Sequence, residues 1–191
     1  MPEGPVWEKT ITGLKNGAKW TTEHKVKSLV GPSVQVDEQG QVSLAWMEED
    51  KDMRSVLYAR STEPGGPMGA PVRINRPEDV PYWRQEAPAL VVQGEDVFVT
   101  WGLAHPKATP QQPFATELRL SRSIDGGKTF QPSVAVNDDP GVIQHTFDAL
   151  HRDADGRLHL SWIDGREGKK EPGTYVARSL DRGATITRNL K

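Results

Sequence analysis

The stretch "SRSIDGGKTF", from Ser121 to Phe130, decides the fold, because "ARSLDRGATI", from Ala177 to Ile186, repeats its pattern. Both follow the frame Ser-x-Asp-x-Gly-x-Thr, which is expected by chance on the order of 10⁻⁵ times per starting position. A glycine turn between β-prone segments predicts a hairpin, and Ser and Asp side chains can bond its free amides. The residues assigned to the two hairpins are Ser123, Asp125, Gly127, Thr129, Phe130, Ser179, Asp181, Gly183 and Thr185.

A longer repeat surrounds these hairpins. Three segments each contain a strand, a glycine turn, a strand ending in Trp46, Trp101 or Trp162, and a strand ending in Arg-Ser. Alternating apolar residues such as Val42, Leu44 and Trp46 are typical of β-strands, and the tryptophans are expected in the core. Four antiparallel strands repeated at roughly 50–60 residues predict an all-β fold, a β-propeller of four-stranded blades.

About three blades are expected, over residues 30–76, 84–138 and 146–191. The fourth strands are expected near Val72, near Val134 and in "TRNLK" at the end of the chain. Residues 1–29 are interpreted as an N-terminal extension or one closing outer strand. Three blades in an open arc leave two blade faces uncovered, so we expect another segment or chain to cover these faces.

Composition excludes several classes of protein. The chain of 191 residues has a net charge of −2, which gives no electrostatic footprint for nucleic acid or an anionic membrane. Its apolar runs are too short for a membrane span, and "MPEGPVWEKT" has no apolar core of a signal peptide. The absence of Cys excludes disulfides and cysteine-based zinc sites. No cofactor and no metal is assigned.

The frame Ser-x-Asp-x-Gly-x-Thr-aromatic resembles the Asp box, or BNR repeat, of the sialidase-like β-propellers. The phrases "YWRQEAPAL", "HTFDAL" and "GRLHLSWIDGR" are similar to a bacterial exo-α-sialidase-like group. The resemblance implies about six blades, so that this chain corresponds to the N-terminal half of a propeller, a fragment or one piece of an assembly. It also implies an extracytoplasmic protein, periplasmic or secreted. The expected partner is a second copy or a separate C-terminal half.

Candidate site residues lie in the loops opposite the Asp boxes, where a rigid scaffold usually carries function. Just before the inner strand of the second blade stand Tyr82, Arg84 and Glu86. An arginine there can clamp a substrate carboxylate, with Glu86 orienting it or serving as a base. The alternative is an Arg–Glu pair that ties adjacent blades together.

The third blade offers a second group. His145 and Asp148 are either an acid/base pair or metal ligands, or else they cap strands or bridge blades. Asp164 and Arg166 follow the blade tryptophan, in a sequence that also reads as a turn. His105 has the same phase in the second blade and is expected to complete a His/Asp cluster with His145, although two histidines alone define no metal site.

The expected function is binding of a glycan or another anionic ligand on this loop face. Sialidases of the resembled family use an arginine triad, a tyrosine nucleophile activated by a glutamate, and an aspartic acid. Their Phe-Arg-Ile-Pro motif is absent here, where "HKVKSLVGP" stands. Glycoside hydrolysis is therefore expected only of a complete propeller, with Glu86, Asp148 and Asp164 as the catalytic candidates. The alternatives are a non-enzymatic scaffold for protein partners and a metal-binding role for His105, His145 and nearby carboxylates in the complete molecule.

Overall fold

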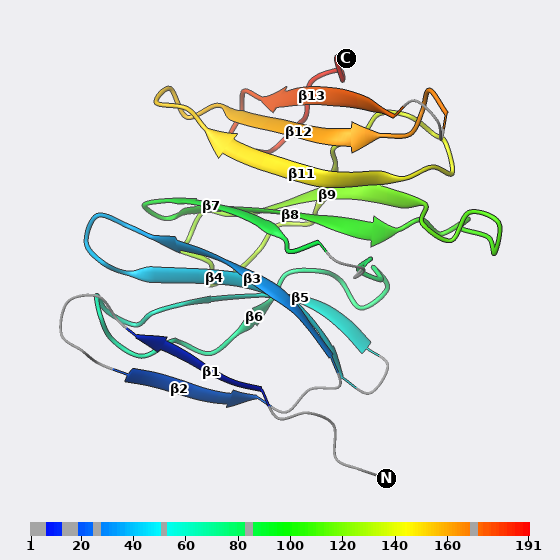
Figure 1. Cartoon of the computed structure of the whole chain (residues 1–191). Helices are drawn as coiled ribbons and strands as arrows, with labels where there is room; N and C mark the ends of the chain where they lie inside the picture. The colour runs from blue at the N-terminus through cyan, green and yellow to red at the C-terminus, as the bar shows by residue number, and fades with distance from the viewer. Residues whose placement is uncertain (1–6, 13–18, 25–27, 51–52, 83–85, 169–171) are drawn as a thin grey trace, which may run out of the picture.

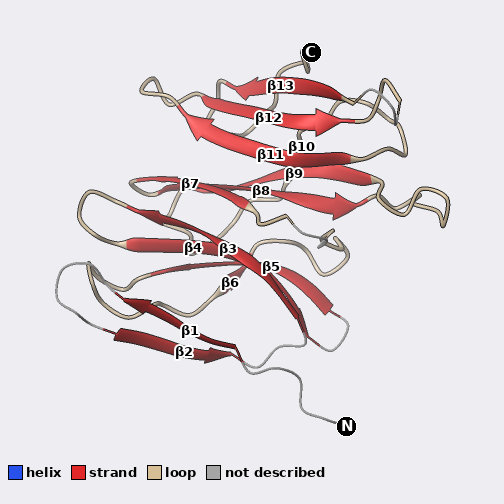
Figure 2. Cartoon of the chain, in the orientation of Figure 1, coloured by secondary structure: helices blue, strands red, loops and turns tan. Residues whose placement is uncertain are grey.

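The computed structural model describes residues 7–12, 19–24, 28–50, 53–82, 86–168 and 172–191. Within these ranges the chain forms strands, turns and loops and no helix, which confirms the all-β prediction (Figure 2). The same ranges accordingly contain no helix able to cross a membrane.

Three antiparallel sheets follow one another along the chain and stack face to face (Figure 1). The first sheet consists of β3 (Ser28–Val36), β4 (Val42–Asp50), β5 (Met53–Arg60) and β6 (Val72–Arg73). The second consists of β7 (Ala89–Gln93), β8 (Asp96–Ala104), β9 (Thr116–Ser123) and β10 (Val134–Ala135). The third consists of β11 (His145–Arg152), β12 (Leu158–Asp164) and β13 (Gly173–Ser179). Each strand pairs with the next one along the chain. The sheets are therefore successive meanders, as in a propeller-like fold.

The first strands of the three sheets lie next to one another. β7 contacts β3 on one side and β11 on the other. Successive sheets of propeller-like folds are arranged in this way, with their first strands as inner strands. The loops that lead into β7 and β11 therefore lie near each other, at the end of the sheets opposite the hairpins at Ser123 and Ser179.

Side chains of β8 alternate between the two faces of the second sheet, so this strand contributes to two hydrophobic cores. Val97, Val99 and Trp101 face the first sheet, where they pack with Met47 and Val56. Phe98, on the other face of the same strand, belongs to the core shared with the third sheet. That second core also contains Leu118, Leu120, Val136, Leu158, Leu160, Trp162, Tyr175 and Ala177. The second sheet thus shares one core with each neighbour.

Two of the three repeat tryptophans are core residues, as predicted. Trp101 and Trp162 are each 1% exposed, and each packs toward the preceding sheet. Trp46 is only half-buried, because it projects from the face of β4 that points away from the second sheet. Its indole Nε1 donates to Glu48 Oε2 at 3.2 Å.

Both ends of the array differ from the sequence expectation. Instead of one outer strand, the N-terminal segment has two strands, β1 (Trp7–Thr12) and β2 (Lys19–His24), which pair with each other (Figure 1). At the other end, "TRNLK" runs beside β13 but pairs with it through one isolated bridge, from Leu190 to Val176, so the third sheet has three strands. One bridged pair is shorter than the two-residue strands β6 and β10.

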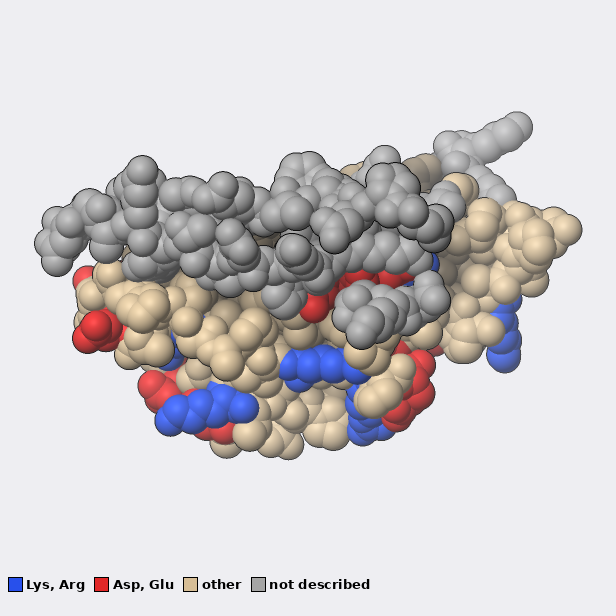
Figure 3. Space-filling view, turned by 90° about the horizontal axis from the view of Figure 1, so that it is seen from below, with Lys and Arg blue, Asp and Glu red and all other residues tan. Residues whose placement is uncertain are grey.

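Charge is mixed on the described part of one face of the molecule. In the view from the β1–β2 side, blue and red side chains are interspersed among the coloured residues, in keeping with the net charge of −2 (Figure 3). On that face the coloured residues form no broad field of one sign.

Candidate functional site

An irregularity in β11 organises the candidate site. The pairing of β11 with β12 shifts register between Thr146 and Ala149, so that Phe147 and Asp148 form a bulge. Phe147 has a φ of 54°, in the left-handed region that non-glycine residues seldom occupy. Bulges re-aim side chains and occur often beside active sites. Here the bulge separates two groups of carboxylates.

The first group consists of Glu86 and Asp148, which come from different sheets. Glu86 precedes β7 and accepts a hydrogen bond from the backbone N–H of Phe147 at 3.2 Å. Asp148 accepts a hydrogen bond from the hydroxyl of Thr100, a fully buried residue of β8. Two carboxylates far apart in the sequence therefore meet where the inner strands begin.

Both carboxyl groups are shifted toward the protonated form. Burial raises the pKa of Glu86 to about 7, the charge of Asp148 adds to this, and the amide of Phe147 opposes it. Burial likewise raises the pKa of Asp148, against the hydrogen bond from Thr100. Among the described residues, no salt bridge neutralises either group. A carboxyl group with a pKa near 7 can donate or accept a proton at neutral pH.

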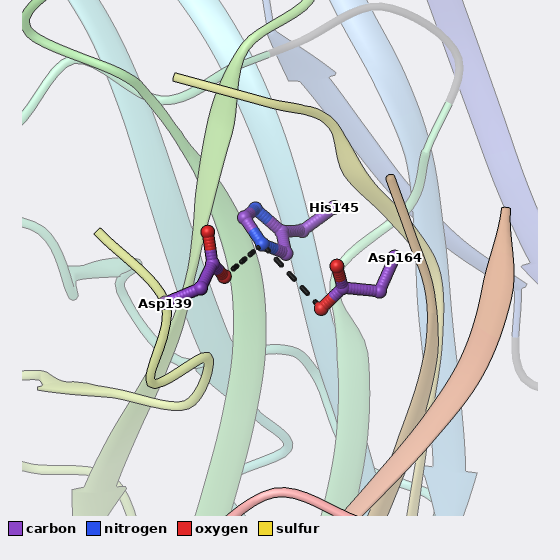
Figure 4. Close-up of side chains that lie close together, drawn as sticks. All are labelled: Asp139, His145 and Asp164. Carbon is purple, nitrogen blue, oxygen red and sulfur yellow. Dashed lines mark hydrogen bonds and ion pairs between the residues drawn. The ribbon is translucent and has the colours of Figure 1, made fainter. Parts of the chain in front are cut away.

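The second group surrounds His145, whose side chain is completely buried. Its Nδ1 lies 2.5 Å from the carbonyl oxygen of Thr116, which can only accept, so Nδ1 carries a proton. Its Nε2 lies 2.7 Å from Asp139 Oδ2 and 3.6 Å from Asp164 Oδ2 (Figure 4). Both ring nitrogens thus face acceptors, as an imidazolium requires.

The pKa values agree with this assignment. Burial opposes the charged form of His145, but the hydrogen bonds to Asp139 and Thr116 outweigh it and raise the pKa. Burial also opposes ionisation of Asp139, yet the hydrogen bond and charge of His145 lower the pKa of that carboxyl to about 2. The pair is therefore held as a buried ion pair.

Arg166 completes the charge balance. Its Nη2 donates to Asp164 Oδ2 at 2.8 Å, its Nη1 to Asp138 at 2.9 Å, and its guanidinium lies 4.1 Å from the ring centre of Tyr175. Trp162 Nε1 also donates to Asp164 Oδ2, at 2.9 Å. Asp164, which is fully buried, is therefore held by an indole and a guanidinium.

The ligand atoms of Asp139, His145 and Asp164 lie within 4.8 Å of one another, a spacing that would suit a metal ion. The donor set fits an ion poorly. His145 Nε2 would have to give up its proton to Asp139, and Arg166 already places a positive charge on Asp164. The cluster is best described as an ion-pair network that joins β9, β11 and β12.

Three sequence candidates remain: His105, Tyr82 and Arg84. His105 does not belong to the His145 cluster; its Nδ1 accepts from the amide of Lys107, and its Nε2 lies 4.0 Å from Glu117. Tyr82 is half-buried, and its amide donates to the carbonyl of Gly102 at 2.7 Å. Arg84 lies outside the described residues. Sequence reasoning missed Asp139, Phe147, Thr100 and Thr116.

The two hairpins with the Ser-x-Asp frame lie at the far end of the sheets. In one, Gly127 N–H bonds Ser123 Oγ at 2.9 Å, and Thr129 donates from N–H and hydroxyl to Asp125. The other repeats this with Ser179, Asp181, Gly183 and Thr185. β9 begins at Thr116 beside His145 and ends at Ser123, so the length of a strand separates the hairpin from the candidate site.

These hairpins also pack between sheets. A Cβ at Gly127 would lie 1.9 Å from the ring of Tyr58, and one at Gly183 would lie 3.2 Å from Phe98. In both cases the aromatic ring belongs to the preceding sheet. The glycines therefore allow each hairpin to lie directly against its neighbour.

No protein-family model and no curated protein matches the chain. Solved structures do. An α-L-arabinanase from Penicillium chrysogenum complexed with arabinobiose superposes with a TM-score of 0.61 at 13% identity, covering 98% of this chain and 60% of that one. An α-L-arabinofuranosidase from Fusarium graminearum gives 0.59 at 10% identity, covering 96% and 57%.

A Hadza microbial sialidase gives a TM-score of 0.58 at 16% identity, covering 86% of this chain and 38% of its own. The chain thus spans less than two thirds of each of these enzymes. Identities this low establish the fold alone. The chain has the propeller-like fold of a group of carbohydrate-active enzymes.

Proposed function

We propose that this chain belongs to a glycan-binding, sialidase-like propeller whose ligand surface is centred on Glu86 and Asp148. The observation that carries the proposal is the pair of carboxyl groups with raised pKa values where the inner strands begin. Ligands of propeller-like enzymes approach such loops, and perturbed titratable groups cluster at functional sites. The Asp-box hairpins support the sialidase-like assignment and serve the scaffold.

The chemistry that suits this pair is acid/base assistance to glycosidic bond cleavage. Glu86, with a pKa of about 7, can hold a proton for the leaving oxygen, while Asp148 supplies the second carboxyl group. Hydrolysis is proposed only for the complete propeller, because the chain spans 38–60% of the enzymes it resembles in fold. An extracytoplasmic location is proposed on the sialidase-like resemblance alone.

Glycan binding tests the proposal. Sialyllactose, arabinobiose, xylotriose and lactose would be titrated into the chain by calorimetry, alone and after Glu86→Gln and Asp148→Asn. We expect at least one sugar to bind and both substitutions to weaken it about tenfold or more. Asp125→Ala, in the distant hairpin, is the matched carboxylate control and should bind normally. Normal binding by both site variants would refute the site.

A second copy of this chain, or a separate C-terminal half, is proposed to complete the ring. Arg60 and Arg122 each donate from Nη1 at 3.1 Å to a turn carbonyl of the following sheet, at Gly94 and Arg182 respectively. Arg178 has the same place in the third sheet and is exposed there. At the other end, Gly65 has a positive φ, as Gly127 does, but no atom of the described residues lies within 4 Å of its Cβ position. The third sheet thus offers an exposed arginine to a following sheet.

Native mass measures this directly. If two copies close the ring, the native mass should be twice 21.1 kDa. Val176→Asp, on the exposed outer face of the third sheet, should then reduce the mass to 21.1 kDa. A stable monomer would refute self-assembly, and a co-purifying chain of another mass would identify a separate half. The exposed apolar residues Val176 and Leu190 at the third-sheet end support the alternative function, a scaffold that binds proteins. Sugar titrations that show no binding, together with binding of a protein partner, would favour it.

A further inference from the structure

Phe147 combines two unfavourable features. Its side chain is 67% exposed, the largest value among the large apolar side chains of the described residues. Its backbone has a φ of 54°, which is costly for a residue with a bulky side chain. A phenylalanine on the surface also forgoes the free energy that burial would provide. Backbone strain of this kind persists where the surroundings enforce it, often at ligand sites.

Turn geometry does not account for Phe147. The other described non-glycine residue with positive φ, Arg182, lies in a tight hairpin next to Gly183, where the chain must reverse. Phe147 lies within β11, where a regular strand would have negative φ. The bulge turns it outward between Thr146, which is buried, and Asp148, which Thr100 holds.

The backbone of Phe147 contacts the pair of Glu86 and Asp148. Its amide donates to Glu86 Oε2, and its neighbour in sequence is Asp148. The ring is therefore displayed to solvent on a backbone that is tied to both carboxyl groups. Sugar sites commonly have this composition, because a sugar ring has an apolar face of C–H groups and an edge of hydroxyls. Aromatic surface meets the first, and a few polar groups fix the second.

We propose that Phe147 is the stacking platform for a sugar ring whose hydroxyls hydrogen-bond to Glu86 and Asp148. This inference rests on the proposed function and assigns its ligand class: a glycan whose bound ring has one face free of axial hydroxyls. An acidic substituent on the sugar is not required. The left-handed backbone at Phe147 turns the ring outward beside the carboxyl groups instead of into the core.

The test separates the ring from the backbone strain. Phe147→Ala and Phe147→Gly remove the ring, and Phe147→Trp keeps an aromatic face. With the four-sugar panel in calorimetry, we expect Ala and Gly to lose about tenfold or more in affinity and Trp to stay within about threefold. Leu180→Ala, at an equally exposed apolar side chain in the far hairpin, is the matched control and should bind normally.

Thermal unfolding gives a second readout. Phe147→Gly should raise the midpoint, because glycine relieves the strain at φ 54° and no packing is lost. A lower midpoint would identify Phe147 as a structural residue and overturn the platform. Unchanged affinity of Phe147→Ala would overturn it as well, while glycan binding stood. If the unmodified chain binds no sugar of the panel, the proposed function and this inference both fail.

Discussion

Two pairs of carboxylates lie on either side of Phe147, and they differ in what surrounds them. Asp139 and Asp164 face a buried imidazolium and a guanidinium, so their charges are balanced by His145 and Arg166. Among the described residues, Glu86 and Asp148 face a backbone amide and a hydroxyl, which stabilise a carboxylate far less. Burial acts on both pairs, so the opposite shifts of the pKa values of Asp139 and Glu86 follow from the counter-charge.

Breaking the balanced group should have the largest effect. Asp164→Ala would remove one of the two carboxylates that His145 and Arg166 share, the other being Asp139, and it would leave the buried indole N–H of Trp162 without its acceptor. We expect this to cost about 3 kcal/mol in unfolding free energy. Urea unfolding measures this. Asp155→Ala removes an exposed ion pair with Arg157 and is the control, with little expected change. A loss no larger than that of the control would contradict the assigned network.

The unbalanced group should respond to pH. The pKa of Glu86 is about 7 when folded and near 4.5 when unfolded, so the folded state binds the proton more tightly. This contribution to stability should be full below about pH 4.5 and should be lost as the pH rises through 7. Because the carboxyl group is half-buried and screened by solvent, we expect the loss to be about 1 kcal/mol. Glu86→Gln should remove this contribution, while the decline that comes from the raised pKa of His145 should remain. The comparison requires unfolding curves of both proteins from pH 4.5 to pH 8.

The acid side sharpens the contrast. Asp139, with its pKa lowered to about 2, contributes stability above its unfolded pKa and loses it as the pH falls toward 2. Asp139→Asn should therefore flatten the decline below about pH 4. Because Asp139 also raises the pKa of His145, the same variant should reduce the part of the decline above pH 6.5 that comes from His145 and leave the part that comes from Glu86. An unchanged decline below about pH 4 would contradict the ion pair.

A smaller effect is expected at Thr100. Thr100→Val keeps the volume but removes the hydroxyl that donates to Asp148, leaving that carboxylate less satisfied, at a cost of about 1–2 kcal/mol. The pKa of Asp148 should rise further. Urea unfolding at pH 5 and pH 8 would measure the loss of unfolding free energy, which should be greater at pH 8, where more of Asp148 is ionised. Equal losses at the two pH values would contradict a hydrogen bond to the ionised carboxylate.

The smallest effect is expected far from both pairs. Asp125 is an exposed carboxylate whose hydrogen bonds stay within one hairpin, and Ser123 and Thr129 lower its pKa. Asp125→Ala should lower the thermal midpoint by a few degrees at most and leave sugar binding intact. A collapse of the fold would show that this hairpin does more than close two strands.

The sequence was informative where patterns are local. Glycine turns and alternation predicted the meanders and the hairpin hydrogen bonds of Ser123 and Ser179, because these depend on a few neighbouring residues. Glu86, Asp148, His145 and Asp164 were recognised as polar residues in loops near the inner strands. Their partners were not: His145 was grouped with Asp148, whereas the structure places it with Asp139 and Asp164.

The reason is the bulge at Phe147, which alternation does not reveal and which changes the facing of every residue after it. Asp139 lies in "NDDPG", which reads as a turn, so its contact across six residues with His145 could not be anticipated. Trp46 is half-buried because it lies on the face of β4 that the second sheet does not cover. Which face of a strand is covered depends on how the sheets assemble, and the sequence pattern of one strand does not show it.

The two cores on opposite faces of β8 have a consequence for how the molecule comes apart. Val97, Val99 and Trp101 depend on the first sheet and Phe98 on the third, so loss of either outer sheet exposes one face of the middle one. Cooperativity then runs between neighbours, as in a linear array, and the ends should fray before the centre. Amide hydrogens of β8, in the middle sheet, should exchange with deuterium last, and those of the first and third sheets should exchange first. The difference between these exchange rates would measure how strongly neighbouring sheets stabilise each other.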